Sequence, residues 1–232
     1  MPDKAHHTGL HSQAILTCRN LSLERDKTSL LKNISVMIPR GMCTVIIGHN
    51  GAGKTLLMQA LHGIVTLSTG QIDAPARQAQ KMVFQKPVML RRTAGQNFDF
   101  ICPGIDPALK GDWFGRAGLR GRMHLPARLL SGGEQQKLAI ISALAASPEL
   151  LFLDEPSAHL DFEASHFVET ELLAARARGM SVVMSSHSRS QAQRLADYIL
   201  LMKRGRLAEF TEKDSFFTSP SSDEGREYLA LT

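Results

Sequence analysis

The feature that most constrains the fold is a glycine-rich segment, GHNGAGKT at residues 48–55, set between two different hydrophobic patterns. The five residues before it, CTVII, are apolar on both faces, which is typical of a strand buried in a parallel sheet. After it, Leu57, Ala60 and Leu61 fall on one face of a helix over residues 54–63. The segment matches the pattern GxxxxGK(S/T) in this strand–loop–helix context, so it predicts a loop that binds phosphate groups.

The predicted loop offers a phosphorylated ligand three kinds of favourable contact. Glycines allow backbone N–H groups to turn inward, and the helix N-terminus adds the positive end of its dipole. Lys54 can reach the β- and γ-phosphates of a nucleotide, and the hydroxyl of Thr55 can coordinate Mg²⁺. The nucleotide-binding residues expected here are Gly48, His49, Asn50, Gly51, Ala52, Gly53, Lys54 and Thr55.

A second chemical signal follows the apolar run at residues 150–153, which ends in Asp154 and Glu155. A buried strand that ends in two carboxylates places them at the carboxyl edge of the sheet, beside the phosphate loop. We expect Asp154 to hold Mg²⁺, directly or through water, and Glu155 to orient and deprotonate an attacking water.

The chain alternates between predicted strands and helices, which indicates an α/β fold with a mostly parallel sheet. The predicted strands cover residues 14–16 continuing to 21–23, 30–38, 43–47, 71–72, 81–84, 150–153, 181–184, 198–202 and 206–210. The predicted helices cover residues 54–63, 133–146, 165–178 and 189–196. Residues 1–13 are polar and His-rich, and we expect a loose tail there.

Composition excludes several classes of protein. The net charge of +5 is too small to argue for nucleic acid on its own, and three widely spaced cysteines do not form a disulfide framework or a zinc motif. No apolar run approaches ~18 residues, and the first residues lack the apolar stretch of a secretory signal. One stretch is rich in basic side chains and holds one acid, Asp112; its basic residues are Lys110, Arg116, Arg120, Arg122 and Arg128. We expect a solvated face there; the alternative, a nucleic-acid patch, lacks interleaved aromatic residues and a known reading module.

The stretch LSGGEQQK at residues 130–137 resembles the LSGGQ signature of ATP-binding cassette (ABC) ATPases. Further elements of that family follow in its usual order. They are the phosphate loop, Gln85 in VFQKP, the signature, LLFLDEP at 150–156, the segment SAHLD at 157–161, and His187 in SSHS. This resemblance runs from about residue 14 to the end of the chain. It implies a P-loop (RecA-like) α/β core with an antiparallel N-terminal β region and an inserted helical subdomain at about 88–147, all within one nucleotide-binding domain at 14–232.

The resemblance also implies a role for several residues, with ATP and Mg²⁺ as cofactors. Gln85 resembles the glutamine that touches Mg²⁺ and the attacking water, and His187 resembles the histidine that contacts the γ-phosphate. Ser131, Gly132 and Gly133 resemble signature residues that grip the ATP of the other subunit, and Asp161 matches an aspartate that connects the two sites. A second ATPase subunit, giving a head-to-tail homodimer that encloses two ATP molecules, is therefore expected.

This sequence departs from the family pattern at a few positions. Arg25 stands about where an aromatic residue usually stacks on adenine, and a guanidinium can also stack on a base. Leu56 replaces a hydroxyl that usually follows Thr55, and Lys137 and Ser142 stand where the signature helix usually carries arginine. His159 is a local variant of the Asp161 segment.

The resemblance implies an ATPase subunit of a membrane importer, bound peripherally at the cytoplasmic face of the cell membrane. Its partners would be transmembrane permease subunits and, indirectly, an extracytoplasmic substrate-binding protein, with no nucleic acid. The run VFQKPVMLRRT at residues 83–93 resembles tungstate importer ATPases, so tungstate or a related oxyanion is the expected cargo. The alternatives are an importer ATPase for phosphate or amino acids, a soluble ABC-type ATPase acting on nucleic acid or ribosomes, and a different P-loop enzyme such as a small-molecule kinase.

Overall fold

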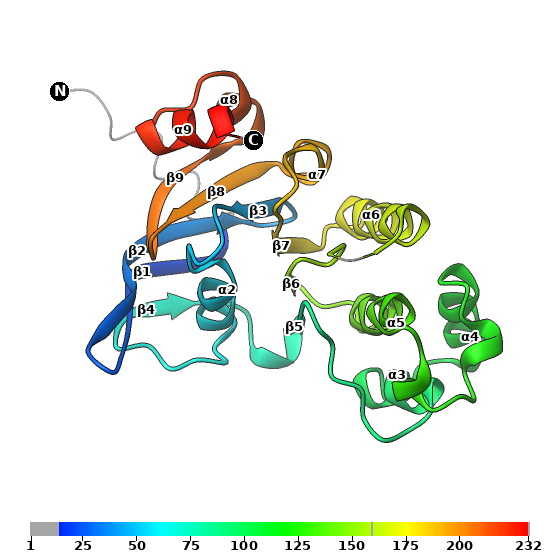
Figure 1. The fold of residues 1–232 in the computed structure, drawn as a ribbon. Helices are drawn as coiled ribbons and strands as arrows, with labels where there is room; N and C mark the ends of the chain where they lie inside the picture. Colours follow the sequence, from blue (N-terminus) through cyan, green and yellow to red (C-terminus); the bar gives the residue numbers. More distant parts are fainter. Residues whose placement is uncertain (1–13, 159, 232) are drawn as a thin grey trace.

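The computed structural model describes residues 14–158 and 160–231, so the predicted tail at 1–13 and His159 lie outside the described residues (Figure 1). The strands are β1 (Ala14–Arg25), β2 (Thr28–Pro39), β3 (Cys43–Ile47), β4 (Thr69–Asp73), β5 (Gln80–Val83), β6 (Leu150–Leu153), β7 (Ser181–Ser185), β8 (Tyr198–Lys203) and β9 (Arg206–Glu212). The α-helices are α2 (Lys54–His62), α3 (Ala94–Ile101), α4 (Pro107–Arg116), α5 (Gly132–Ala145), α6 (Phe162–Ala177), α7 (Arg189–Leu195), α8 (Lys213–Thr218) and α9 (Asp223–Leu231). Three short 3₁₀ helices are η1 (Arg77–Ala79), η2 (Arg120–Arg122) and η3 (Ala127–Leu129).

The strands form two sheets, which confirms the expected α/β class. The larger sheet has the order β5-β6-β7-β3-β8-β9, and its strands are parallel except for β9, which runs antiparallel to β8. The smaller sheet, β2-β1-β4, is antiparallel and contains the N-terminal region. The structure thus has the mixed architecture that the sequence predicts.

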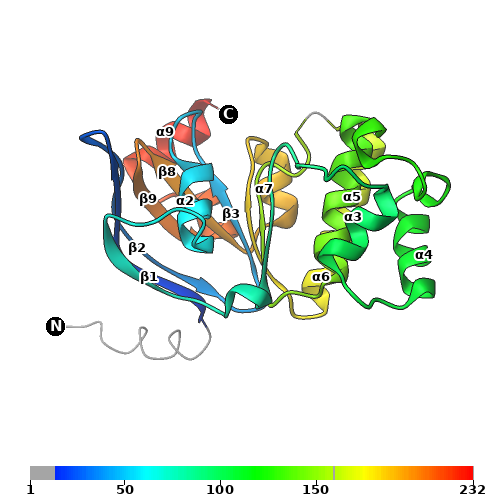
Figure 2. The ribbon, with the colours of Figure 1, turned by 90° about the horizontal axis from the view of Figure 1, so that it is seen from below.

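The larger sheet is covered on both faces, which explains why its strands are almost continuously apolar. Since successive side chains point to opposite faces, Val45 and Ile47 pack with helices α5, α6 and α7, whereas Ile46 packs with α2 and the smaller sheet. Phe152 likewise joins the α2 layer and is fully buried. Figures 1 and 2 show α2 and the smaller sheet on one side of the molecule and α3, α4 and α5 on the other.

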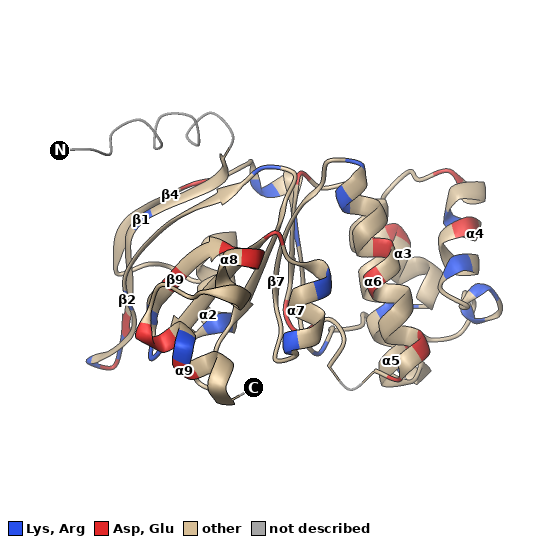
Figure 3. Ribbon diagram, turned by 90° about the horizontal axis from the view of Figure 1, so that it is seen from above, with Lys and Arg blue, Asp and Glu red and all other residues tan. Residues whose placement is uncertain are grey.

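Helices α3, α4 and α5 follow β5 and enclose a core of their own, in which Phe98 and Phe114 are fully buried. The basic residues of this region form the predicted solvated face, since Arg116, Arg120, Arg122 and Arg128 are exposed and Lys110 is half-buried. Each also has a partner that the sequence did not predict: Lys110–Asp99, Arg116–Glu171, Arg120–Asp112, Arg122–Glu134 and Arg128 with the carbonyl oxygen of Met89. Most of these partners lie outside residues 110–128, and Figure 3 shows acidic and basic positions interspersed along α4.

The C-terminal helices return to the larger sheet. Phe216 of α8 is fully buried in its core, and the ring of Tyr228 in α9 lies 6.0 Å from the ring of His49, so α9 sits close to the phosphate loop. Among the helices that the structure describes, none combines the length and the apolar character needed to span a membrane.

Candidate active site

The loop at residues 48–53 is held in a conformation that only glycine adopts without strain. Gly48 has a φ of 143°, and a Cβ there would lie 2.3 Å from the carbonyl oxygen of Met202. The loop is tied to the β8–β9 turn as well, because the N–H of Gly205 donates to the carbonyl oxygen of Ala52 at 2.9 Å. At Gly51, by contrast, a Cβ would meet no heavy atom of the described residues within 4 Å, so this part of the loop is open to a ligand.

Lys54 begins α2, and its side chain reaches back to the start of this loop. The side chain is only 6% exposed, and its Nζ donates to the carbonyl oxygens of Gly48 at 2.8 Å and His49 at 3.3 Å. Burial lowers the pKa of Lys54, and the carboxylates of Glu155 and Asp154 oppose that effect. An ammonium group with two carbonyl partners and one remaining donor is suited to pair with an anion that enters the loop.

Thr55 and Asp154, two of the three residues expected to contact Mg²⁺, are in direct contact, while the third, Gln85, is hydrogen-bonded to Glu155. The Thr55 hydroxyl lies 3.0 and 2.8 Å from the two carboxylate oxygens of Asp154. Asp154 is also held by Ser185, whose hydroxyl donates to Oδ1 at 2.7 Å. A hydroxyl beside an oriented carboxylate is the hard oxygen donor set that Mg²⁺ prefers, so these residues fit the ion.

The three residues predicted to be catalytic meet at the ends of three neighbouring strands. Gln85 follows β5, Glu155 follows β6 and His187 follows β7, and the register aligns Val83 with Leu153 and Leu153 with Met184. Nε2 of Gln85 donates to Oε2 of Glu155 at 2.9 Å, and Nε2 of His187 lies against Oε1 of the same carboxylate.

The backbone of Glu155 is unusual for a residue with a side chain. Its φ is 46°, in the left-handed region, and its N–H donates to the hydroxyl of Ser185 at 2.9 Å. A non-glycine residue held there carries a strain of order 1–3 kcal/mol, and such residues cluster at functional sites. The strained turn and Ser185 aim the carboxylate toward Gln85 and His187.

The predicted signature residues lie at another helix. Ser131 caps α5: its hydroxyl accepts from the N–H of Glu134 at 3.3 Å, while the Glu134 side chain accepts from the N–H of Ser131 at 2.8 Å. Gly132 is exposed beside it, and Gly133 faces Leu160. Both views show α5 apart from α2, so the signature and the phosphate loop of one chain do not meet (Figures 1 and 2).

Asp161 and Arg25 have local partners in the structure. Oδ1 of Asp161 accepts from the N–H of Ala164 at 2.7 Å and so caps α6. Arg25 ends β1 at the hairpin, where its side chain is 82% exposed and lies 4.0 Å from Asp26. Leu56, the residue that replaces a hydroxyl, packs against the core of the smaller sheet.

Sequence reasoning missed the polar residues that support this site. Ser185 bonds both Asp154 and the backbone of Glu155, and Ser157, Ser186 and Gln191 form a hydrogen-bonded group behind His187. The available signal was Ser185 and Ser186 at the end of an apolar strand, directly before His187.

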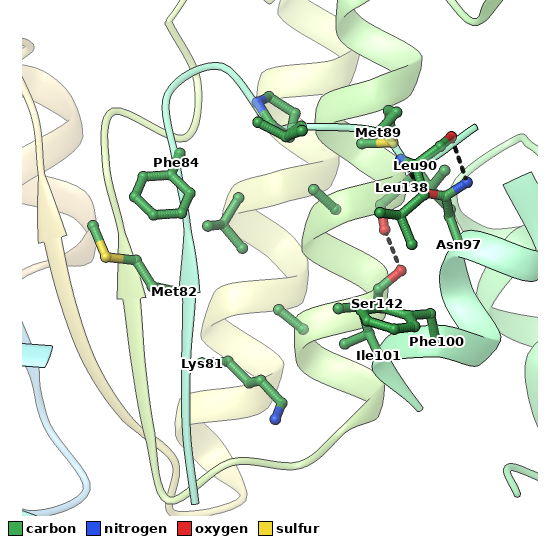
Figure 4. A pocket seen from close by; sticks show the side chains of 15 residues that line it. Lys81, Met82, Phe84, Met89, Leu90, Asn97, Phe100, Ile101, Leu138 and Ser142 are labelled. Carbon is green, nitrogen blue, oxygen red and sulfur yellow. Dashed lines mark hydrogen bonds between the residues drawn. The ribbon is translucent and has the colours of Figure 1, made fainter. Parts of the chain in front are cut away.

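An apolar pocket of about 250 Å³ lies beside the active site, where the segment after β5 crosses α3 and α5. Figure 4 shows Phe84, Met89, Leu138 and Phe100 around it. Its rim is exposed, since Val88 is 83% and Phe100 is 59% accessible. The amide of Asn97 holds the loop in place by accepting from the N–H of Leu90 at 2.9 Å.

Comparisons with known proteins agree with this geometry. A family model described as ABC transporter matches residues 31–158. The chain is 32% identical to the phosphate import ATP-binding protein PstB 2 of Aliivibrio fischeri, over 98% of this chain and 94% of that protein. It is 29% identical to the glutamate transport ATP-binding protein GluA of Corynebacterium glutamicum, over 86% and 91%.

Solved structures show the same fold. An ATP-binding subunit of an ABC transporter superposes with a TM-score of 0.83 at 22% identity, covering 93% of this chain and 99% of that one. CbiO1 of Clostridium perfringens, described as part of the ABC transporter complex cbiONQ, superposes with a TM-score of 0.74 at 26% identity, covering 90% and 92%.

Proposed function

The chain belongs to the ABC transporter family and is an ATPase, and from that premise we propose that it is the ATP-hydrolysing subunit of an importer for a small oxyanion. The observation that carries the ATPase part is the meeting of Gln85, Glu155 and His187 beside the Thr55–Asp154 pair. Hydrolysis needs an anion cradle, oxygen ligands for a cation and a base for water, and these residues supply all three.

The nucleotide would be held by the loop at residues 48–55. Its backbone N–H groups and the Lys54 ammonium would bind the phosphates, and Thr55 with Asp154 would hold Mg²⁺. The ion, when bound, supplies positive charge that neutralises phosphate oxygens. We propose that Arg25 stacks on the adenine ring of the nucleotide, because its exposed guanidinium can lie on an aromatic ring.

Glu155 would act on water. Its carboxylate would accept a proton as the water oxygen attacks the γ-phosphorus and the bond to the bridging oxygen of ADP breaks. Gln85 would orient that water through its amide, and His187 would donate a hydrogen bond to the γ-phosphate. Both side chains already touch Glu155, so the three groups that would act on water and phosphate stand together.

A second copy of the chain would complete each site. Ser131, Gly132 and Gly133 stand at an exposed helix N-terminus away from the phosphate loop of their own chain. Backbone N–H groups at a helix N-terminus bind anions, so the signature of one subunit would grip the γ-phosphate held by the other. Asp161, at the start of α6, would lie between the two sites.

Permease subunits would dock on the apolar pocket beside Gln85 (Figure 4). We propose that the helical segment at about 88–147 moves with the permease and that Gln85 passes the state of the nucleotide to it. An exposed apolar rim next to a polar active site suits a short amphipathic helix of a partner protein. This arrangement would keep the chain at the cytoplasmic face of the membrane as a peripheral subunit, with an extracytoplasmic substrate-binding protein on the far side.

The cargo class rests on similarity. The relatives include ATPases of phosphate importers, and the segment after β5 resembles tungstate importers, so both point to a tetrahedral oxyanion. GluA, a glutamate transport protein, supports the amino-acid alternative. The test is uptake in cells lacking this chain, with tungsten, molybdenum, phosphate and glutamate measured in parallel. Loss of tungsten or phosphate uptake alone is expected; loss of glutamate uptake alone would overturn the oxyanion assignment and leave the ATPase intact.

A further inference from the structure

A cavity of about 260 Å³ has Glu155 and His187 in its wall, together with polar side chains to which the hydrolytic mechanism gives no role. It is formed by the loop after β6, the loop after β7 and the facing sides of α6 and α7. Gln191 of α7 lines it and is only 6% exposed.

The side chain of Gln191 bonds three different parts of the chain. Its Nε2 donates to the Ser157 hydroxyl at 3.1 Å and to Oε1 of Glu169 at 3.1 Å. Its Oε1 accepts from the Ser186 hydroxyl at 2.8 Å. Both amide donors and the amide acceptor are therefore engaged, so the orientation of the carboxamide is fixed by its partners.

Glu169 determines which way the amide points. Arg194 follows Gln191 by about one turn of α7, and its guanidinium donates to both carboxylate oxygens of Glu169, at 2.9 and 2.7 Å. The hydrogen bond from Arg194 is the largest influence on the pKa of Glu169; burial opposes it, and the net effect lowers that pKa. An ionised carboxylate accepts hydrogen bonds only, so the NH₂ of Gln191 must face Glu169 and its oxygen must face Ser186.

The two serines belong to the two loops that carry the proposed chemistry. Ser157 follows Glu155 by two residues, and the turn between them closes with the N–H of Ala158 on the carbonyl oxygen of Glu155 at 3.0 Å. The same loop leads to Asp161 at the start of α6. Ser186 directly precedes His187. One buried side chain thus joins the loop from Glu155 to Asp161 with the segment that holds His187.

We propose that Gln191 is a positioning residue that keeps His187 in register with the loop from Glu155 to Asp161, so that both respond together when a second subunit contacts Asp161. This proposal rests on the proposed function of His187 and Glu155. Gln191 would act through Ser157 and Ser186 and touch neither nucleotide nor water. Its contribution is geometric, and a shift of about 1 Å at a reacting group can cost about 100-fold in rate.

The test uses a charge swap between Gln191 and Glu169. Gln191→Glu keeps the size of the side chain but replaces the donor with a carboxylate that faces Glu169, so the two groups repel each other. We expect kcat for ATP hydrolysis to fall about 10-fold or more, with KM for ATP within about 2-fold of wild type, because the Lys54 loop is untouched. The double variant Gln191→Glu/Glu169→Gln restores a donor–acceptor pair and should recover at least about a third of the wild-type kcat.

Gln193→Glu makes the same chemical change on the exposed side of α7 and is the matched control, expected to retain wild-type kinetics. If Gln191→Glu does not fold, as judged by thermal unfolding, Gln191→Met takes its place and should show the same fall in kcat at constant KM. Unchanged kcat in a folded Gln191 variant, or a folded double variant with no recovery, would overturn the positioning role. Glu155→Gln tests the underlying function separately: full hydrolysis in that variant would remove the premise, whatever Gln191 does.

Discussion

The hydroxyl of Thr55 lies 2.8 Å from one carboxylate oxygen of Asp154 and 3.0 Å from the other, although 99 residues separate the two in sequence. Thr55 stands in the first turn of α2 and Asp154 directly follows β6, so this contact joins the phosphate loop to the carboxyl edge of the sheet. Two of the three residues expected to contact Mg²⁺ are therefore neighbours already, and Ser185 also hydrogen-bonds Asp154. A cation bound between them would replace the hydrogen bond from Thr55 to Asp154 and would leave α2 and β6 in place.

Replacing Lys54 with alanine should abolish nucleotide binding. The substitution removes the one ammonium inside the loop and leaves the carbonyl oxygens of Gly48 and His49 without their donor. Losing one member of a buried charge pair costs about 2–5 kcal/mol, so affinity should fall at least about 30-fold. Calorimetric titration with ATP and Mg²⁺ measures this affinity. Lys213→Ala on α8 serves as a control and should keep wild-type affinity. Wild-type affinity in Lys54→Ala would contradict the phosphate-loop assignment.

Glu155→Gln should bind ATP and fail to hydrolyse it. Glutamine has nearly the same shape and preserves a partner for Gln85, but it cannot accept a proton from water. Loss of a general base reduces the rate by about 10²–10⁴-fold. The ATP-bound dimer should then accumulate and elute early in size-exclusion chromatography with ATP. Glu149→Gln, at the opposite end of β6, should behave like wild type; a monomeric, active Glu155→Gln variant would show that another group is the base.

If each ATP site is built from two subunits, two inactive variants with lesions in different parts of the site should regain ATPase activity when they are mixed. Ser131→Arg places a bulky cation at the start of α5 and should inactivate the site that this signature completes, while Lys54→Ala inactivates the site in its own chain. Mixed in equal amounts, the two inactive variants form heterodimers in which one site carries both lesions and the other carries neither. ATPase activity of the mixture above that of either variant alone is expected. Ser131→Arg at the same total concentration without the second variant is the control and should remain inactive.

The candidate active site was largely predictable because its residues stand at the ends of apolar segments. An apolar run that ends in Asp154 and Glu155 predicts a strand and a polar edge together, and parallel strands bring such edges to one place. The contacts among Gln85, Glu155 and His187 follow from that rule. The hydrogen bonds of Gln191 do not, because they depend on how α6 and α7 pack, which no local pattern encodes.

Helices α3 and α4 were harder to predict than α5, for a local reason. Helix α4 contains Gly111 and Gly115, which lower helix propensity by about 1 kcal/mol each, so its pattern is weak. Its start is nevertheless marked by Asp106 as the cap and Pro107 in the first turn. Helix α3 begins with a capping box of Thr93 and Gln96, so its start too is marked in the sequence, although its apolar pattern is short.

The last prediction concerns Glu209, a buried carboxylate in β9 that anchors the C-terminal helix. Its two oxygens accept hydrogen bonds from the N–H and hydroxyl groups of both Ser221 and Ser222, at 2.5–3.1 Å, and these residues lead into α9. Burial raises the pKa of Glu209, but the four hydrogen bonds outweigh it and the net effect lowers that pKa. Glu209→Gln replaces one acceptor oxygen with a donor that faces other donors, and should reduce the free energy of unfolding by about 2–4 kcal/mol at pH 7.

The lowered pKa of Glu209 also determines how the loss of stability in Glu209→Gln depends on pH. A carboxyl group whose pKa is lower in the folded state contributes stability that is fully present above its unfolded value, near 4.5, and that is lost as the pH falls through the folded value. The difference between wild type and Glu209→Gln should therefore be constant from pH 8 to pH 6 and shrink below about pH 4.5. Urea unfolding at several pH values, without nucleotide, measures it. Glu212→Gln, an exposed carboxylate at the end of the same strand, is the control and should change stability by less than about 0.5 kcal/mol throughout. A difference that grows as the pH falls would mean that Glu209 is protonated in the folded chain and does not anchor α9 as a carboxylate.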